Sequence, residues 1–283
     1  MKKGAHNLND LLIAARKNKY AIGGFNFNFY DDALGIVLGA YELSSPVFLM
    51  ASEGTVKFLG VKKIVNYVKQ LKEDFNIPIV LHLDHGKNIE IIKECIKDGF
   101  DSIMYDGSLL DFENNIKNTR MIAELCHDRG IPLEGELGRI SGIEENVENI
   151  DDVLTDPDSV VEFIERSKVD SLAIAIGNAH GLYKDKPKLD FERLSKINDI
   201  SSVPLVLHGG TGIPLEDIKK AIKLGISKVN IGTEIKITYF KTIKRYIGTI
   251  NKNDVRHLIS TIQNDIKELV KQYIEIFGSF NRI

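Results

Sequence analysis

Three histidines of this chain stand at or just past the ends of short apolar runs: His85, His180 and His208. Asp84 comes directly before the first of them. A neutral imidazole at the point where a buried strand meets a loop is a suitable ligand for a divalent metal, and three protein ligands with one open position are typical of a catalytic zinc site. An adjacent carboxylate supplies a partner for proton transfer. The pattern therefore predicts metal-assisted chemistry on a carbonyl compound.

Each of these histidines taken alone is better explained as a hydrogen-bonded core residue. Each, however, is followed directly by a glycine, and the three together favour a metal site. His82 differs, because it has the same strand parity as Asp84. We expect His82 to point into the protein interior as a packing residue or as a support for the site.

Two short loops rich in small residues indicate phosphate binding. Gly209, Gly210 and Thr211 follow one apolar run, and the segment 230–233, Asn-Ile-Gly-Thr, closes the next. Small residues let backbone N–H groups approach an anion closely. A single loop of this kind is equally well explained as a plain tight turn, but two of them after neighbouring strands favour a phosphate site.

Short apolar runs alternate with helical patterns along the chain, which predicts parallel strands joined by helices. Eight such units predict an α/β fold, the (β/α)8 or TIM barrel, formed by residues 1–283 as a single domain. Reactive groups in this fold sit at the carboxyl ends of the strands, where most of the candidate polar residues fall. The predicted strands are 21–27, 47–52, 79–85, 102–108, 132–138, 171–177, 204–210 and 228–233.

Three additions to this frame are expected. An extra amphipathic helix precedes the first strand, and an amphipathic helix over 261–278 follows the last one, packed either on the barrel or on another subunit. The acidic segment 139–155 after the fifth strand is long enough to act as a lid.

Composition excludes several classes of protein. The chain has 283 residues, of which 27% are charged. Its net charge of −3 does not indicate the basic surface that binds nucleic acid. No run of about 18 apolar residues could span a membrane. Cys95 and Cys126 are isolated, which is typical of reduced core residues in a cytoplasmic protein.

Six segments carry a resemblance to a known family. LHLDHG (81–86), MYDGS (104–108), LEGELGRISG (133–142), AIAIGNAHGLY (173–183), LVLHGGTGIP (205–214) and KVNIGTEIK (228–236) are similar to the class II, metal-dependent fructose-bisphosphate and tagatose-bisphosphate aldolases. The resemblance runs from the first helix to the end of the chain. It implies a carbon–carbon lyase that cleaves a ketose bisphosphate reversibly to dihydroxyacetone phosphate and glyceraldehyde 3-phosphate.

The resemblance also implies a role for each matching position. Asp84 would exchange a proton with the C4 hydroxyl, and Glu144 would shuttle a proton on the dihydroxyacetone phosphate carbon. Zn²⁺ would be the catalytic metal, with a monovalent cation, Na⁺ or K⁺, near the phosphate. A homodimer or homotetramer is implied. The zinc ligands would be His85, His180 and His208, a second or displaced metal position would use Asp106 and Glu136, and substrate contacts would come from Ser52, Gly181, Gly209, Gly210, Thr211, Asn230, Ile231, Gly232 and Thr233, with Asn26 as a weaker one.

The lid departs from the family pattern. The family commonly has two glycines, one residue, then Glu-Asp, whereas this chain reads Ser141, Gly142, Ile143, Glu144, Glu145. The choice between Glu144 and Glu145 as the lid acid therefore stays open. Features of fructose-type and tagatose-type members occur side by side, so the sequence does not decide the sugar.

Three alternatives remain from the sequence. A Schiff-base aldolase would need a lysine inside the barrel at a strand end, but Lys228 is expected to open a strand and Lys184 to lie in a loop. A non-catalytic protein that binds phosphosugar or metal would not need Asp84 and Glu144 beside the histidines. A class II aldolase could also act on another phosphorylated keto sugar acid, as in inositol breakdown.

Overall fold

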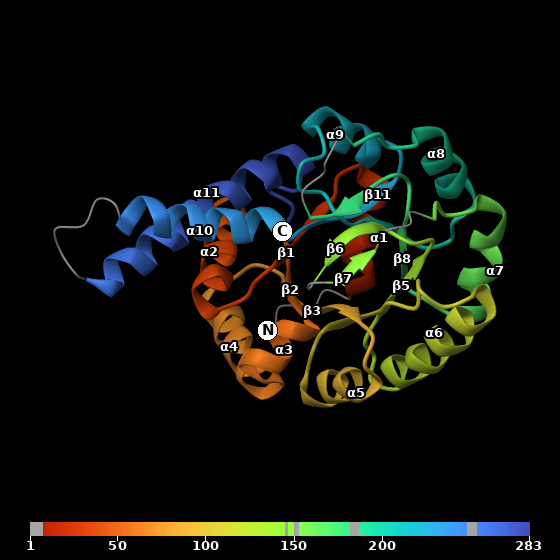
Figure 1. Ribbon diagram of the computed structural model, residues 1–283, viewed down its shortest axis with the longest axis horizontal. Coiled ribbons are helices and arrows are strands. Elements are labelled where there is room, and N and C mark those ends of the chain that lie inside the picture. Colours follow the sequence, from red (N-terminus) through yellow and green to blue (C-terminus); the bar gives the residue numbers. More distant parts are fainter. Residues whose placement is uncertain (1–7, 145–146, 150–152, 182–186, 248–253) are drawn as a thin grey trace.

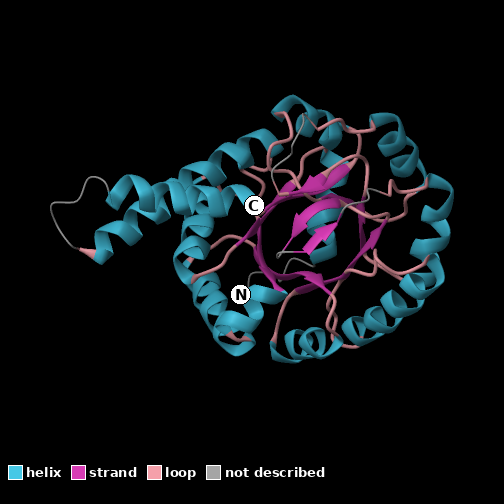
Figure 2. Cartoon of the chain, viewed as in Figure 1, coloured by secondary structure: helices cyan, strands magenta, loops and turns pink. Residues whose placement is uncertain are grey.

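Parallel strands close into a barrel, as Figure 2 shows. The computed structural model describes residues 8–144, 147–149, 153–181, 187–247 and 254–283, and within them the barrel has eight strands. Their order around the barrel is β1-β2-β3-β4-β5-β8-β10-β11, and β11 pairs with β1. This confirms the predicted (β/α)8 architecture. The barrel strands are β1 (Ile22–Asn26), β2 (Val47–Ser52), β3 (Ile79–Gly86), β4 (Ser102–Tyr105), β5 (Leu133–Leu137), β8 (Ser171–Ile174), β10 (Leu205–Leu207) and β11 (Ile226–Ile231).

The strands form where the apolar runs predict them, because a parallel strand covered on both faces needs apolar side chains throughout. β4, β8 and β10 end three residues before their predicted ends, and the strand starts agree to within one residue except in the last strand. β11 begins at Ile226, two residues before the predicted start, so the expectation that Lys228 opens this strand is wrong. Lys228 lies inside the strand and is fully buried. Ile226 and Ser227 form the missing beginning, and Ile226 pairs with Leu205 of β10.

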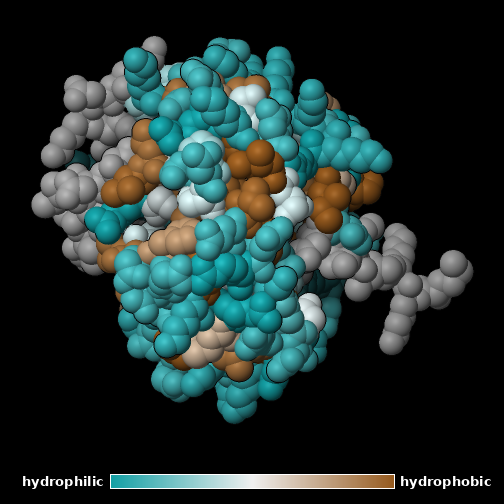
Figure 3. Space-filling model, turned by 90° about the vertical axis from the view of Figure 1, so that its right-hand side faces the viewer, coloured by the Kyte–Doolittle hydropathy of each residue, from teal (hydrophilic) through white to brown (hydrophobic). Residues whose placement is uncertain are grey.

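A ring of helices surrounds the barrel (Figure 1). Figure 3 shows the side that carries α6 to α8, where hydrophilic side chains cover most of the surface, as expected for the outer faces of amphipathic helices. Of the helices that the structure describes, none is long and apolar enough to cross a membrane. The ring is formed by α2 (Tyr30–Glu42), α3 (Glu53–Leu59), α4 (Val61–Asp74), α5 (Ile89–Asp98), α6 (Phe112–His127), α7 (Pro157–Ser167), α8 (Phe191–Ile200), α9 (Leu215–Lys223) and α10 (Thr233–Ile247).

The predicted extra helices are both present. α1 (Leu8–Asn18) is seen through the barrel in Figure 1. Its Leu12 and Ala15 pack with Phe48 and Val80 of the barrel strands, so α1 closes the amino-terminal end of the barrel.

The C-terminal helix α11 (Val255–Phe277) packs on the barrel's outer helix α2. The approach is close, because a Cβ at Gly39 would lie 2.8 Å from the carbonyl oxygen of Lys267. The buried face of α11 is therefore covered within the same chain. The far ends of α10 and α11 project away from the barrel (Figure 1).

The segment expected to be a lid forms a small sheet of its own. β6 (Ser141–Glu144) pairs antiparallel with β7 (Val147–Asn149) and parallel with the short strand β9 (Ala179–His180). The sequence predicted a long loop here, and the structure has a hairpin instead.

Candidate active site

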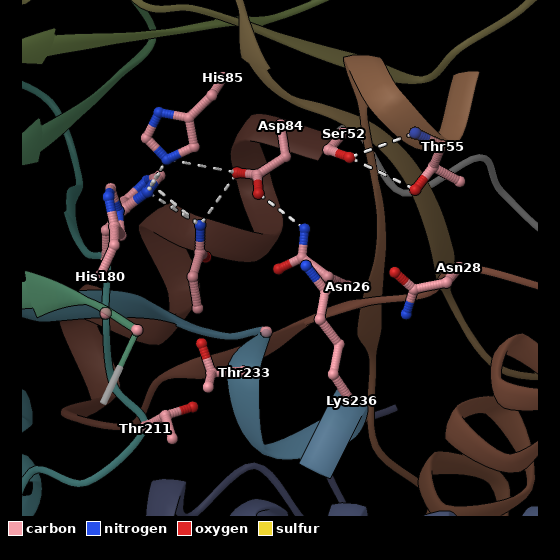
Figure 4. A pocket seen from close by; sticks show the side chains of 15 residues that line it. Asn26, Asn28, Ser52, Thr55, Asp84, His85, His180, Thr211, Thr233 and Lys236 are labelled. Carbon is pink, nitrogen blue, oxygen red and sulfur yellow. Dashed lines mark hydrogen bonds and ion pairs between the residues drawn. The ribbon is translucent and has the colours of Figure 1, made fainter. Parts of the chain in front are cut away.

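A cavity of about 640 Å³, partly open to solvent, lies at the carboxyl ends of the barrel strands. Figure 4 shows the side chains that point into it. Gly210 and Ile231, which were expected to contact substrate, are not among the lining residues; they pack against each other beneath the loop, since a Cβ at Gly210 would lie 2.8 Å from Ile231 Cδ1. The lining residues are Asn26, Asn28, Ser52, Thr55, Asp84, His85, His180, Gly181, His208, Gly209, Thr211, Asn230, Gly232, Thr233 and Lys236.

The three predicted histidines converge in this cavity. One ring nitrogen from each of His85, His180 and His208 lies within 4.8 Å of the others. The Nε2 atom of His85 is 2.8 Å from Nδ1 of His208. Burial, followed by the neighbouring rings, holds the pKa of His180 and His208 well below the ordinary value, so both rings are neutral and able to bind a cation.

Two carboxylates determine which nitrogens face each other. His85 Nδ1 is 3.1 Å from Asp106 Oδ2, and His208 Nε2 is 2.9 Å from Glu134 Oε1. An ionised carboxylate only accepts hydrogen bonds, so these two nitrogens carry the protons. The lone pairs of His85 Nε2 and His208 Nδ1 then point at each other, an arrangement that a proton or a metal cation shared by the two rings would stabilise. This donor set fits a divalent metal bound by three imidazoles.

Asp106 is held in the ionised state that this arrangement needs. Burial opposes its ionisation, but the hydrogen bond from His85 and the ammonium of Lys87 help to keep the pKa of Asp106 well below the usual value. Lys87 Nζ is 3.0 Å from Asp106 Oδ2. His85, Asp106 and Glu136 also group closely enough to hold a cation, the predicted second metal position, and Lys87 already places one positive charge beside it.

Asp84 and His85 both face the cavity although neighbouring strand residues normally point to opposite sides. His85 has a φ of 48°, in the left-handed region, and the pairing register shifts between Leu83 and Gly86. Such a residue costs about 1–3 kcal/mol and persists only where its surroundings fix it. The buried Glu53 does so by accepting hydrogen bonds from the backbone N–H groups of Lys87 and Asn88.

The Asp84 carboxylate lies between two amides. Asn26 Nδ2 donates to its Oδ2 at 2.7 Å, and Asn230 Nδ2 lies 3.4 Å from its Oδ1. Burial acts to raise the pKa of Asp84, but the electrostatic effect of the neighbouring histidines and of the Lys228 ammonium, with the hydrogen bond from Asn26, brings it below the ordinary value. The carboxylate is therefore ionised and able to accept a proton.

The first of the two loops predicted to bind phosphate needs a glycine at position 209. Gly209 has a φ of 63°, and a Cβ there would lie 2.1 Å from the carbonyl oxygen of Ala179. Thr233 begins α10 and lines the cavity together with Thr211, whose Oγ1 accepts from the N–H of Glu234 at 3.3 Å. The free N–H groups of a helix N-terminus favour anions.

The lid is hydrogen-bonded to the strand that bears one of the histidines. Gly142 of β6 pairs with His180 of β9. Glu144 is the last residue of β6, and the alternative lid acid, Glu145, lies outside the described residues.

Several residues of the cavity and its support escaped the sequence reasoning. Asn28, Thr55 and Lys236 line the cavity, and Figure 4 shows Lys236 extending from the start of α10 toward Asn26. Lys236 stands in the last quoted family segment, three residues after Thr233, which was the available signal for it. Glu134 had a signal too, since it shares strand parity with Glu136.

The interior lysine bears on the Schiff-base alternative. Lys228 lies inside the barrel, as that mechanism would need, but its Nζ forms an ion pair with Glu134 Oε2 at 2.8 Å. It does not line the cavity. Lys184 lies outside the described residues. A lysine held as a paired ammonium is a poor nucleophile, so Lys228 does not support Schiff-base chemistry.

Comparison with known proteins agrees with this geometry. The family model "Fructose-bisphosphate aldolase class-II" matches residues 6–282. A fructose-bisphosphate aldolase of Geobacillus stearothermophilus is 41% identical over 277 residues, which cover 96% of this chain and 96% of that protein. The solved structure of the YdjI aldolase from Escherichia coli K12 is 35% identical with a TM-score of 0.88, covering 97% of this chain and 98% of that one. A putative fructose-1,6-biphosphate aldolase from Coccidioides immitis is 30% identical with a TM-score of 0.91, covering 98% of each chain. The resemblance seen in the sequence is confirmed, and the chain belongs to the class II fructose-bisphosphate aldolase family of carbon–carbon lyases.

Proposed function

We propose that this protein cleaves fructose 1,6-bisphosphate, or tagatose 1,6-bisphosphate, reversibly to dihydroxyacetone phosphate and glyceraldehyde 3-phosphate. The observation that carries the proposal is the convergence of His85, His180 and His208 beside the ionised Asp84 in one cavity. A cluster of imidazoles that can hold a Lewis-acid metal, with an adjacent base, suits the deprotonation of a hydroxyl on the carbon β to a polarised carbonyl, the step in which the bond between the α and β carbons breaks.

The metal that we propose for the three histidines is Zn²⁺. Their donor set consists of nitrogen atoms alone, and all three line the cavity, so a fourth coordination position would face it, as in catalytic zinc sites. Zinc bound there would act as a Lewis acid on the ketone carbonyl of the substrate. The chain's own contribution is to hold His85 and His208 in the tautomers that direct their lone pairs to one point.

Asp84 is the proposed base for the C4 hydroxyl. Asn26 and Asn230 hold its carboxylate from both oxygens, which fixes its direction in the cavity. Asn230 also lines the cavity, so it would both position Asp84 and contact the sugar.

The phosphate of the dihydroxyacetone phosphate half would bind at Gly209, Thr211 and the start of α10 at Thr233. The support is the close approach that glycine allows at 209 and the N–H groups at the α10 N-terminus. Gly181, which has a φ of 85°, lines the same cavity. A monovalent cation, Na⁺ or K⁺, is proposed beside this phosphate.

The second phosphate needs a cation in the cavity. Lys236 supplies one among the described lining residues and extends toward Asn26, while Ser52 and Thr55 line the wall formed by β2 and α3. We assign Ser52 to the aldehyde half on this basis. Glu144 would return a proton to the dihydroxyacetone phosphate carbon once the β6–β7 hairpin covers the cavity, and water exclusion would protect the reacting carbon there.

Cleavage assays with metal analysis test the proposal. Purified protein is loaded with zinc, and release of triose phosphate is followed with fructose and tagatose 1,6-bisphosphates side by side. We expect turnover that a chelator abolishes and that borohydride leaves intact. Borohydride inactivation with chelator resistance would overturn the metal mechanism, and zinc binding without cleavage of either sugar would favour the non-catalytic alternative.

The remaining proposals concern assembly and location. We propose that residues 1–283 act as one aldolase domain in the cytoplasm and assemble as a homodimer or homotetramer. Support for assembly comes from the projecting ends of α10 and α11, where Phe240, Ile247 and Val255 are exposed. Sedimentation measurements test this: a monomer at working concentration would contradict it, and Phe240→Ser should weaken the assembly.

A further inference from the structure

Two oppositely charged side chains lie beneath the histidine cluster and take no part in the mechanism proposed above. Lys228 and Glu134 form an ion pair with side chains that are 0% and 2% exposed. Their atoms Nζ and Oε2 are 2.8 Å apart. Removing two charges from water costs several kcal/mol per ion, and apolar residues of similar volume often serve stability as well or better. Stability alone is therefore a weak explanation for a charged pair at this depth.

The pair continues directly to one of the proposed metal ligands. Glu134 uses its second oxygen, Oε1, to accept from His208 Nε2 at 2.9 Å. One carboxylate thus joins the lysine on one side to the imidazole on the other. Behind Lys228, His82 Nε2 lies 3.3 Å from the ammonium, and His82 Nδ1 lies 2.8 Å from Ser102 Oγ. His82 is inside the barrel, as its strand parity predicted.

The direction of the hydrogen bond determines what His208 offers to a metal. With the proton on Nε2, the lone pair is on Nδ1, the atom that lies 2.8 Å from His85 Nε2. With the proton on Nδ1, the ring would present an N–H to the metal position and could not bind. A neutral imidazole in water populates both forms, so an acceptor at Nε2 is needed to select one. Lys228 holds that acceptor in place and stabilises its charge.

We propose that Glu134 and Lys228 are positioning residues that fix the tautomer and orientation of His208 for metal binding. The inference deepens the proposed zinc site and rests on it. Asp106 does the equivalent for His85, but it is itself in a group that can hold a second cation. Glu134 pairs with Lys228 and belongs to neither group that can hold a cation, so its proposed role is only to orient His208. Partners of this kind typically change metal affinity by about 10- to 100-fold when they are removed.

Two double variants of matched volume test the proposal. Glu134→Met with Lys228→Met removes both charges together, so neither is left unpaired, and leaves His208 Nε2 without its acceptor. Glu134→Gln with Lys228→Met also removes both charges but keeps a carbonyl that can accept from Nε2. Zinc affinity of the full chain is measured by competition with a chromogenic chelator, without any sugar phosphate. We expect a loss of about 10- to 100-fold for the Met/Met variant and a smaller loss for the Gln/Met variant.

Ser102→Ala is the matched control. It removes the hydroxyl partner of His82 in the same buried layer but leaves the bond from His208 to Glu134 intact. We expect its zinc affinity to stay within about twofold of wild type, because the orienting partner is unchanged. An equal loss in Ser102→Ala and in the Met/Met variant would mean that the layer acts only through stability, and would overturn the proposal. Wild-type affinity in a folded Met/Met variant would overturn it as well.

A second measurement needs no variant. In metal-free wild-type protein labelled with ¹⁵N-histidine, the NMR spectrum reports which nitrogen of each ring carries a proton. We expect His208 to be protonated at Nε2 and not at Nδ1, and the opposite tautomer would overturn the proposal. Neither readout involves cleavage. A protein that binds zinc as described but cleaves neither ketose bisphosphate would contradict the proposed function and leave this inference standing.

Discussion

The two halves of the cavity are built in different ways. One half stands on barrel strands: Asp84, His85 and Asn230 lie in β3 and β11, and each is buried. The other half stands on the small sheet over the barrel mouth, where β6 ends at Glu144 and β9 carries His180. His180 is half-buried, whereas His208 is 1% exposed. The strand half has fixed hydrogen-bond partners, and the other half depends on three short strands outside the barrel.

This difference matches two demands of the proposed reaction. A metal and a base must hold one geometry closely, which favours rigid strand ends. A group that protonates the product carbon must act after substrate has entered, which favours an element that can cover the cavity. The pairing of Gly142 with His180 joins the two halves, because the lid strand and a proposed metal ligand share backbone hydrogen bonds.

The largest effect should come from a ligand in the strand half. His208→Ala should lose its zinc, and turnover should fall by about 10,000-fold, because a Lewis acid supplies several kcal/mol and 1.36 kcal/mol is tenfold in rate. Metal analysis and a cleavage assay on the same sample check this. His127→Ala is the control, since its ring is 42% exposed and pairs with Asp170 on the surface. Unchanged zinc content in His208→Ala would remove it from the ligand set.

The base in the same half should give the next largest effect. Asp84→Ala should keep its zinc and its fold but lose about a thousandfold in cleavage, since positioned proton transfer contributes about 10²–10⁴-fold. Exchange of the dihydroxyacetone phosphate proton with D₂O should persist, because we assign that step to the lid. Cleavage at near wild-type rate would show that another group takes the hydroxyl proton.

A substitution in the lid half should affect proton exchange on dihydroxyacetone phosphate, the step that Asp84→Ala leaves intact. Glu144→Ala should slow proton exchange on dihydroxyacetone phosphate by about 100-fold, at the lower end of the range for proton transfer, while zinc content stays unchanged. NMR in D₂O measures the exchange directly. Glu145→Ala is the matched variant, and a larger loss there than in Glu144→Ala would assign the lid acid to Glu145.

The half of the cavity on barrel strands could largely be predicted from the sequence, whereas the half on the small sheet could not. The apolar runs predict the barrel strands, and their polar ends predict His208 and Asp84, because a parallel barrel brings strand ends together. Pattern reasoning selects His85 as a ligand but does not predict how its side chain and that of Asp84 both reach the cavity, since this depends on a left-handed backbone conformation next to the contacts of the distant Glu53. The role of Glu144 came only from family resemblance, because lid geometry is not encoded in strand alternation.

Lys228 illustrates a second limit. A lysine near the start of an apolar run is usually a surface residue at a strand start, because burying an unpaired ammonium is costly. Here Glu134, which lies on a strand that is not adjacent to β11, supplies the partner. The two residues are 94 positions apart in the sequence, so no local sequence pattern can predict that they pair.

The smallest effect should come from the exposed wall of the cavity. Lys236→Met should raise KM for the ketose bisphosphate by about tenfold with little change in kcat, because a hydrogen bond to a charged group is worth about 1.5–3 kcal/mol and Lys236 is partly screened by solvent. Higher salt should raise the wild-type KM toward that of the variant, since screening weakens an exposed ion pair.

Lys244→Met on the same helix α10 is the control for this variant, because Lys244 is exposed but does not line the cavity. It removes the same charge, so the net charge of the two proteins is equal. A KM change shared by both would mean that Lys236 acts through the overall charge of the protein. A change in KM confined to Lys236→Met would assign the second phosphate to the wall between α10 and β2. The two halves of the cavity would then differ in the chemistry that they supply, and the two phosphates of the substrate would differ in the groups that bind them.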